Sequence, residues 1–220
     1  MTAPRPRLIL ADDHRLLVQG LREMLGKRFD IVGVAYDGEA LLELLRATTA
    51  DCLLLDLSLP GRSGLEILPE VRTLQPALRV LVLTMHVDRI LAEASLAAGA
   101  LGFVPKDSGM EELETALTEV LAGRRFLSSR VPRSSHRLGL DAAHLSVSRL
   151  TPRQQEILHL LGQGKSSGEI ADHFGLTISA ITWHRAHIRK VLGLTNEWEL
   201  ARFAILVHLA TGEERTGPAA

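Results

Sequence analysis

The sequence predicts two domains of different class: an α/β domain built on a parallel five-stranded sheet, and after it a small all-α domain of four helices. The chain has 220 residues, which is comfortable for two domains and long for one. Residues 1–123 alternate short apolar runs with longer stretches of helical period, whereas only helical signals follow residue 150. These observations together define the predicted fold class.

Five short runs rich in apolar and β-branched residues are the predicted strands, at Arg7–Ala11, Ile31–Ala35, Cys52–Asp56, Val80–Thr84 and Gly102–Val104. Stretches of helical period lie between and after them, at Leu16–Leu25, Glu39–Leu45, Leu65–Leu74, Ile90–Ala98 and Met110–Leu121. Such regular alternation predicts βα units around a parallel sheet. In sheets of this kind, chemistry collects at the carboxyl ends of the strands.

Capping signals define the helices of the second domain. Thr151 and Ser166 are followed three residues later by Gln154 and Glu169, and each pair predicts a capping box that begins a helix. A longer helix is expected at about 178–192, and a fourth at roughly 197–209. Four short helices with tight turns predict a small helical domain.

The predicted domain ranges are 1–123, a linker at 124–147, the helical domain at 148–212 and a tail at 213–220. The linker range is rich in Arg, Ser, Pro and His and has no clear apolar period. The first range holds 12 Lys/Arg against 18 Asp/Glu, and the helical domain holds 7 against 5. This asymmetry favours the second domain as the one that meets nucleic acid.

Composition excludes several classes of protein. The sequence has one cysteine, Cys52, so an intramolecular disulfide is impossible. We expect Cys52 to be a small buried hydrophobic residue. No apolar run approaches the ~20 residues of a membrane span, and the first seven residues hold no signal-peptide core. We therefore expect a cytoplasmic protein without a membrane partner.

Polar side chains of matched chemistry follow four of the five predicted strands. Asp12 and Asp13 follow the first strand, Asp56 ends the third, Thr84 ends the fourth and Lys106 follows the fifth. Clustered carboxylates repel one another, and their hard oxygen atoms suit Mg²⁺. Asp56 is the expected nucleophile, which would form an aspartyl phosphate, with Lys106 and the Thr84 hydroxyl binding the phosphate oxygens.

Residues 7–122 resemble the receiver domain of response regulators over essentially their full length. The matching residues are Asp12, Asp13, Asp56 with the following Leu-Ser-Leu-Pro-Gly, Gly64, Thr84 and Lys106. The resemblance implies a flavodoxin-like (βα)5 fold and phosphoryl transfer from a sensor histidine kinase to Asp56. It also implies that Mg²⁺ is held by Asp13, Asp56 and the backbone carbonyl of Ser58, with Asp12 acting through a water molecule.

The same resemblance implies a switch between Thr84 and Phe103, which lies three residues before Lys106. Phosphate would draw Thr84 inward, and Phe103 would rotate into the space left behind. A core aromatic with no switching role is the other interpretation of Phe103. Pro105 precedes the lysine, whereas in many receivers a proline follows it, so the local loop differs from the family pattern.

Residues 149–206 resemble the LuxR-type helix-turn-helix domain of the NarL/FixJ class of response regulators. The matching residues are Leu150-Thr151-Pro152-Arg153, Gln155-Glu156-Ile157-Leu158, Gly164, Glu169-Ile170-Ala171, Leu176, Ile181, His184, Ile188 and Leu192-Gly193-Leu194. The resemblance implies that the helix at about 178–192 is the recognition helix, which lies in the major groove. It also implies a homodimer on activation, formed through the last helix.

The DNA-binding candidates are Thr182, Trp183, Arg185, Ala186, Arg189 and Lys190. Arg185, Arg189 and Lys190 are expected to meet phosphates, which supply affinity but little sequence information. Trp183 has two open interpretations: packing on thymine methyls or sugar, or a protein contact. Many family members carry lysine where Thr182 stands, so this helix has fewer cations than usual.

Three functions from different classes are compatible with parts of the sequence. The leading hypothesis is a transcription regulator that phosphorylation switches. The alternative is a regulator that acts through protein–protein contact, with weak or no DNA binding. An enzyme that hydrolyses phosphate esters through Asp56 is disfavoured, because Ser58 stands where such an enzyme would need a second acid.

Overall fold

The computed structural model describes residues 4–85, 87, 89–132 and 147–213. The chain divides into two compact units, Met1–Arg133 and Ser134–Ala220, each with its own cluster of buried apolar side chains. Among the described helices, none has the length and apolar character that a membrane span requires.

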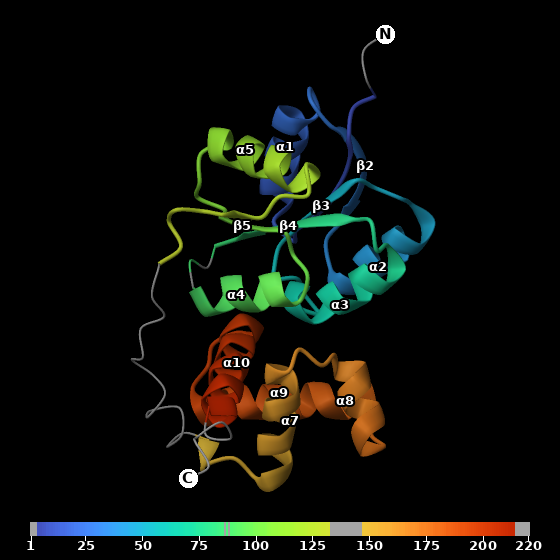
Figure 1. Ribbon diagram of the computed structural model, residues 1–220. Coiled ribbons are helices and arrows are strands. Elements are labelled where there is room, and N and C mark those ends of the chain that lie inside the picture. Colours follow the sequence, from blue (N-terminus) through green and yellow to red (C-terminus); the bar gives the residue numbers. More distant parts are fainter. Residues whose placement is uncertain (1–3, 86, 88, 133–146, 214–220) are drawn as a thin grey trace, which may run out of the picture. The chain divides into compact units, whose positions relative to one another are not determined.

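The first unit is a six-stranded parallel sheet covered by helices on both faces (Figure 1). Its strand order is β2-β1-β3-β4-β5-β6, which confirms the predicted flavodoxin-like α/β fold and adds a sixth strand to the predicted five. The strands are β1 Arg7–Ala11, β2 Asp30–Ala35, β3 Cys52–Leu55, β4 Arg79–Thr84, β5 Gly102–Pro105 and β6 Phe126–Leu127. The helices are α1 Arg15–Leu25, α2 Gly38–Ala47, α3 Gly64–Leu74, α4 Arg89–Ala97 and α5 Met110–Leu121. Figure 1 shows α1 and α5 on one face and α2, α3 and α4 on the other.

The pleat of the sheet assigns each strand residue to one of these two faces. Leu54, Leu81 and Val104 belong to the apolar cluster that α1 and α5 cover. Their strand neighbours Leu55 and Val82 are also fully buried, because α2, α3 and α4 cover the opposite face. Burial on both faces explains why these strands read as continuous apolar runs rather than alternating ones.

The sixth strand corrects the predicted linker boundary. Phe126 and Leu127 pair with Gly102 and Phe103 of β5, so residues 124–132 belong to the first unit and not to a linker. Ser128 N continues this pairing with a hydrogen bond to Phe103 O at 3.0 Å. A two-residue strand is too short to produce an alternating pattern, which is why the sequence did not predict it. The rest of the predicted linker, 133–146, lies outside the described residues.

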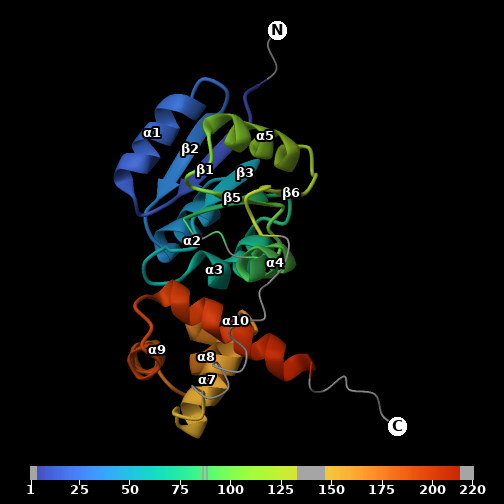
Figure 2. The ribbon, with the colours of Figure 1, turned by 90° about the vertical axis from the view of Figure 1, so that its left-hand side faces the viewer.

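In the described part of the second unit, the helices with defined bounds are α7 Pro152–Gly162, α8 Ser167–Phe174, α9 Ile178–Leu192 and α10 Glu197–Glu213 (Figure 2). Both predicted capping boxes are present, at Thr151 and Ser166. Gly175 and Gly193 end α8 and α9 in the left-handed conformation, which glycine adopts without strain. α10 extends four residues beyond its predicted end and includes Glu213, which was predicted to begin the tail. The rest of the predicted tail, 214–220, lies outside the described residues.

Candidate functional site

The predicted acidic residues meet at the carboxyl edge of the sheet. Asp12 and Asp13 follow β1, and Asp56 follows β3, whose backbone is tied to β1 by a hydrogen bond from Asp56 N to Ala11 O at 2.8 Å. Side-chain atoms of Asp12, Asp13, His14 and Asp56 all lie within 4.8 Å of one another. Parallel strands in register explain this convergence, since their carboxyl ends share one edge. We call Asp12, Asp13 and Asp56 the acidic cluster.

Gly64 allows the loop after β3 to close tightly around Asp56. Gly64 N donates to Leu57 O at 3.0 Å, and Ser63 caps α3 with a hydrogen bond from Glu66 N. A Cβ atom on Gly64 would lie 2.3 Å from the backbone oxygen of Asp56, far inside van der Waals contact. Only glycine fits this approach without moving the backbone that carries Asp56.

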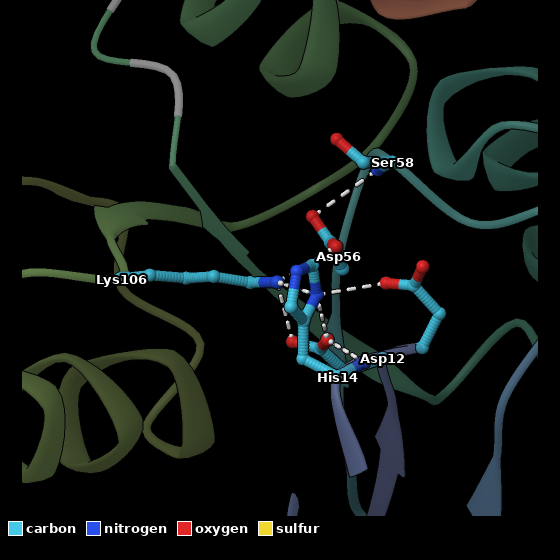
Figure 3. Close-up of polar contacts among 6 residues, drawn as sticks. Asp12, His14, Asp56, Ser58 and Lys106 are labelled. Atoms are coloured by element: carbon cyan, nitrogen blue, oxygen red, sulfur yellow. Dashed lines mark hydrogen bonds and ion pairs between the residues drawn. The ribbon is translucent and has the colours of Figure 1, made fainter. Parts of the chain in front are cut away.

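Lys106 reaches from the end of β5 across the edge to two of the carboxylates (Figure 3). Its Nζ lies 2.7 Å from Asp12 Oδ2 and 2.8 Å from Asp56 Oδ2. The three side chains are almost fully buried, at 4%, 5% and 0% exposure. One cation therefore balances two carboxylates in an environment where unpaired charge is costly.

Burial and charge act in opposite directions on these groups. Burial raises the pKa of the Asp56 carboxyl above its ordinary value, and the hydrogen bond and charge of Lys106 offset this only in part. Burial by itself would lower the pKa of Lys106, but its hydrogen bonds and charge interactions with Asp12 and Asp56 outweigh burial and raise it. At neutral pH the lysine is therefore the fixed counter-charge of the acidic cluster.

The sequence reasoning missed His14, which the structure places beside the acidic cluster. Its Nδ1 lies 2.8 Å from Asp13 Oδ1 and 3.2 Å from Asp12 Oδ1, and its backbone N donates to Asp12 Oδ1 at 2.9 Å. The same ring nitrogen is 3.4 Å from Lys106 Nζ. Its position directly after the aspartate pair was the available signal.

The donor set of the acidic cluster fits a hard divalent cation. Three carboxylates face one another, and Asp13 Oδ1 is buried without a hydrogen bond of good geometry from any described residue. Oxygen ligands of this kind are those that Mg²⁺ takes in proteins. Ser58 N donates to Asp56 Oδ1 at 3.1 Å, which orients the carboxylate; the predicted use of the Ser58 carbonyl as a ligand stays a prediction.

Thr84 and Phe103 lie on neighbouring strands and point to the same face of the sheet. In the register of β4 and β5, Val82 pairs with Phe103 and Thr84 pairs with Pro105, and residues two apart on a strand share a face. Both Thr84 and Phe103 are fully buried. The arrangement suits the predicted coupling between them, and the switching role itself stays a prediction.

A second candidate site is one face of α9, made of its exposed residues. These are Ile178, Ser179, Thr182, Trp183, Ala186, His187 and Lys190, which recur every fourth position and so share one side of the helix. We call this set the exposed face of α9. It contains four of the six predicted DNA contacts.

The structure corrects the prediction for Arg185. Its side chain is buried, and its guanidinium donates to Glu197 Oε2 through Nε at 3.1 Å and to Ser167 Oγ through Nη1 at 2.6 Å. Arg189 also lies beside Glu197, with Nε 3.1 Å from Oε1, and is only partly exposed. Arg185 therefore joins α9 to the starts of α8 and α10 rather than facing solvent. Helical spacing placed it near Lys190 but could not reveal the carboxylate at the start of the next helix.

Comparison with known proteins agrees with this geometry. Residues 8–118 match the response regulator receiver domain, and residues 148–204 match the LuxR family of bacterial regulatory proteins. The transcriptional regulatory protein MctR of Rhizobium johnstonii is 32% identical over 205 residues, covering 92% of this chain and 94% of that protein. The nitrate/nitrite response regulator protein NarL of Escherichia coli is 33% identical over 199 residues, covering 88% and 92%.

A solved structure matches almost the whole chain. It is RcsB from Salmonella enterica serovar Typhimurium, bound to a promoter in the presence of the phosphomimetic BeF3-, with 28% identity and a TM-score of 0.58. The match covers 93% of this chain and 100% of that one. The chain therefore belongs to the NarL/FixJ class of response regulators, in which a receiver domain is joined to a LuxR-type DNA-binding domain.

Proposed function

We propose that a sensor histidine kinase phosphorylates this regulator on Asp56, and that the modification controls its dimerisation and its sequence-specific binding to DNA. The observation that carries the proposal is the buried Asp56 beside Lys106 and the acidic cluster, in the same chain as a LuxR-type domain. Transcription regulation of this kind takes place where the chromosome lies, so the proposed location is the bacterial cytoplasm.

The proposed chemistry is nucleophilic attack by an Asp56 carboxylate oxygen on the phosphorus of a phosphohistidine. A P–O bond forms, the N–P bond breaks, and the released imidazole nitrogen takes up a proton. Lys106 Nζ, now 2.8 Å from Asp56 Oδ2, then pairs with the phosphate oxygens, and Thr84 contributes a hydroxyl. Asp13, Asp56 and the Ser58 carbonyl would hold Mg²⁺, with Asp12 acting through water. When bound, this ion neutralises charge on the transferring phosphoryl group.

Phosphorylation changes the ion pairs at the end of β5, and this change is the proposed origin of the switch. Lys106 exchanges a carboxylate partner for a phosphate with more charge, and Thr84 and Phe103 respond on the same face of the sheet. Phosphorylation shifts the equilibrium between the inactive form and the DNA-binding, dimeric form. The size of this shift equals the free energy by which phosphorylation favours the dimeric form. The partners of the active form are thus DNA and a second copy of the chain.

The test combines phosphorylation with DNA selection on the full-length protein. Wild type, Asp56→Asn and the exposed-acid control Asp30→Asn are treated with a small-molecule phosphoryl donor and Mg²⁺, and phosphate uptake is followed by intact mass. Each is then titrated against duplexes selected from a random library, with and without beryllofluoride. We expect phosphate uptake only in wild type and Asp30→Asn, and only these two should bind DNA at least about tenfold more tightly with beryllofluoride than without it. Equal affinity with and without the phosphate mimic would refute the switch.

A second candidate function is regulation through protein contact, and the exposed face of α9 favours it. Trp183 is 61% exposed there, while the two arginines of α9 both engage Glu197, which leaves few cations for phosphate contacts. If no duplex is enriched under any condition, while a partner protein is retained only by phosphorylated chain, this second function replaces the first.

A further inference from the structure

The exposed face of α9 carries two large apolar side chains and only one residue with a fixed charge. Ile178 is 60% exposed and Trp183 is 61% exposed, and Ala186 lies exposed between Trp183 and Lys190. Lys190 is the exposed residue with a fixed charge on this face. Both large side chains are therefore available for contact with a ligand of this face.

Neighbouring rings fix the position of Trp183. The His187 ring stacks on the indole, with centroids 5.3 Å apart and planes 20° apart. The His184 ring meets it edge-on, at 5.1 Å and 77°. Contact with two rings limits the rotamers of Trp183 before any ligand binds, so less conformational entropy is lost on binding.

The major groove offers one apolar feature that such a surface can read. Each base pair there presents hydrogen-bonding groups, and thymine alone among the four bases adds a methyl group, on C5. On the first two turns of the exposed face of α9, Ile178 and Trp183 present large apolar side chains. Thr182 adds a methyl group, while its hydroxyl already donates to Ile178 O at 3.0 Å.

We propose that Trp183 is a specificity-determining residue that reads thymine by contact with its 5-methyl group in the major groove. This inference rests on the proposed DNA-binding function and adds the chemical identity of the bases that are read. Lys190, two turns further along the same face, contacts phosphate and contributes affinity without base discrimination. His187 supports the indole as a positioning residue.

The experiment uses full-length protein in its beryllofluoride form and a duplex selected from a random library. Each thymine of the selected site is replaced, one at a time, by deoxyuridine, which removes the methyl group and leaves all hydrogen-bonding groups in place. We expect about fourfold weaker binding for each methyl that Trp183 contacts, the equivalent of the ~0.8 kcal/mol for burying one such group. In Trp183→Ala the same replacements have no further effect, because the two changes remove one interaction.

Two further variants separate the mechanisms. Trp183→Phe keeps an aromatic ring and retains part of the deoxyuridine effect, whereas Lys190→Ala weakens thymine and uracil duplexes by the same factor. A deoxyuridine effect of equal size in wild type and Trp183→Ala overturns the proposal. So does a Trp183→Ala defect with no deoxyuridine effect, which indicates packing on sugar instead. If no duplex is selected at all, the DNA-binding function itself fails, and the reading of thymine falls with it.

Discussion

Replacing Lys106 by alanine tests the charge balance of the acidic cluster. The substitution leaves the Asp12 and Asp56 carboxylates, which Lys106 Nζ now contacts at 2.7 and 2.8 Å, buried without their counter-charge. Removing one partner of a buried ion pair destabilises proteins by ~3–5 kcal/mol. Part of the cluster meets solvent at Asp13, so we expect about 3 kcal/mol in metal-free buffer, at the lower end of that range.

The pH dependence of this effect follows from the direction of the pKa shifts. Burial raises the pKa of Asp56, and Lys106→Ala removes the hydrogen bond and charge that hold it down, so the pKa of Asp56 rises further. The loss of stability is therefore largest near pH 8 and shrinks as the pH falls through the raised pKa, where Asp56 becomes neutral. The pKa of Lys106 is raised in the wild type. Its contribution to the free energy of unfolding is therefore complete below the ordinary lysine pKa of 10.5, and it is lost only as the pH rises beyond that value.

Hydrogen exchange measured by mass spectrometry reports this stability domain by domain in the full-length protein. Opening free energies are compared for peptides that cover β3 in wild type, Lys106→Ala and the exposed-lysine control Lys27→Ala, with EDTA present. Trp183 and Trp198 are the two tryptophans and lie in the second unit, so fluorescence should give the same unfolding curve for all three proteins. A loss below 1 kcal/mol at pH 8, or one that grows toward pH 5, would refute the reasoning.

Further expected outcomes concern other parts of the chain. Arg185→Ala should destabilise the second unit by about 2 kcal/mol, since the buried guanidinium of Arg185 binds Glu197 and Ser167. Arg189 is partly exposed, so Arg189→Ala should lower the free energy of unfolding by less than about 1 kcal/mol. Urea unfolding followed by tryptophan fluorescence compares the two variants, and equal losses would contradict the structural role of Arg185. A plot of the logarithm of the DNA-binding constant against the logarithm of the salt concentration should be less steep by about 0.9 in Lys190→Ala, the value for one phosphate contact. An unchanged slope would exclude that contact. Burial raises the pKa of Cys52 to about 12, so a thiol reagent at pH 8 should label it only as fast as the receiver unfolds, and rapid labelling of native protein would contradict this.

The acidic site was predictable because each of its residues follows a strand. Asp12, Asp56 and Lys106 occupy carboxyl ends of predicted strands, and a parallel sheet brings such ends to one edge whatever the details of packing. The order of the elements was predictable for a similar reason, since the alternation of apolar runs and helical periods is a local property. The caps at Thr151 and Ser166 are equally local, because both capping partners lie within three residues.

The errors arose where a side chain finds its partner far along the chain. Arg185 is close to Lys190 on the helix, but Glu197 lies twelve residues away on another helix, and only the tertiary structure brings the two together. β6 forms because Phe126 and Leu127 pair with the free edge of β5. The sequence around residues 126 and 127 contains no pattern that indicates this edge. His14 comes to lie beside the acidic cluster because of the geometry of the turn after β1.

The sequence by itself therefore determined the two domains, the order of their elements and which residues gather at the acidic site. All three depend on local periodicity and on the shared direction of parallel strands. Only the tertiary structure decided which cations of α9 remain exposed, where the first domain ends, and that Lys106 balances two buried carboxylates at once. The physical reason is that burial and ion pairing depend on distances between residues far apart in the chain, and these distances exist only after the helices and strands have packed.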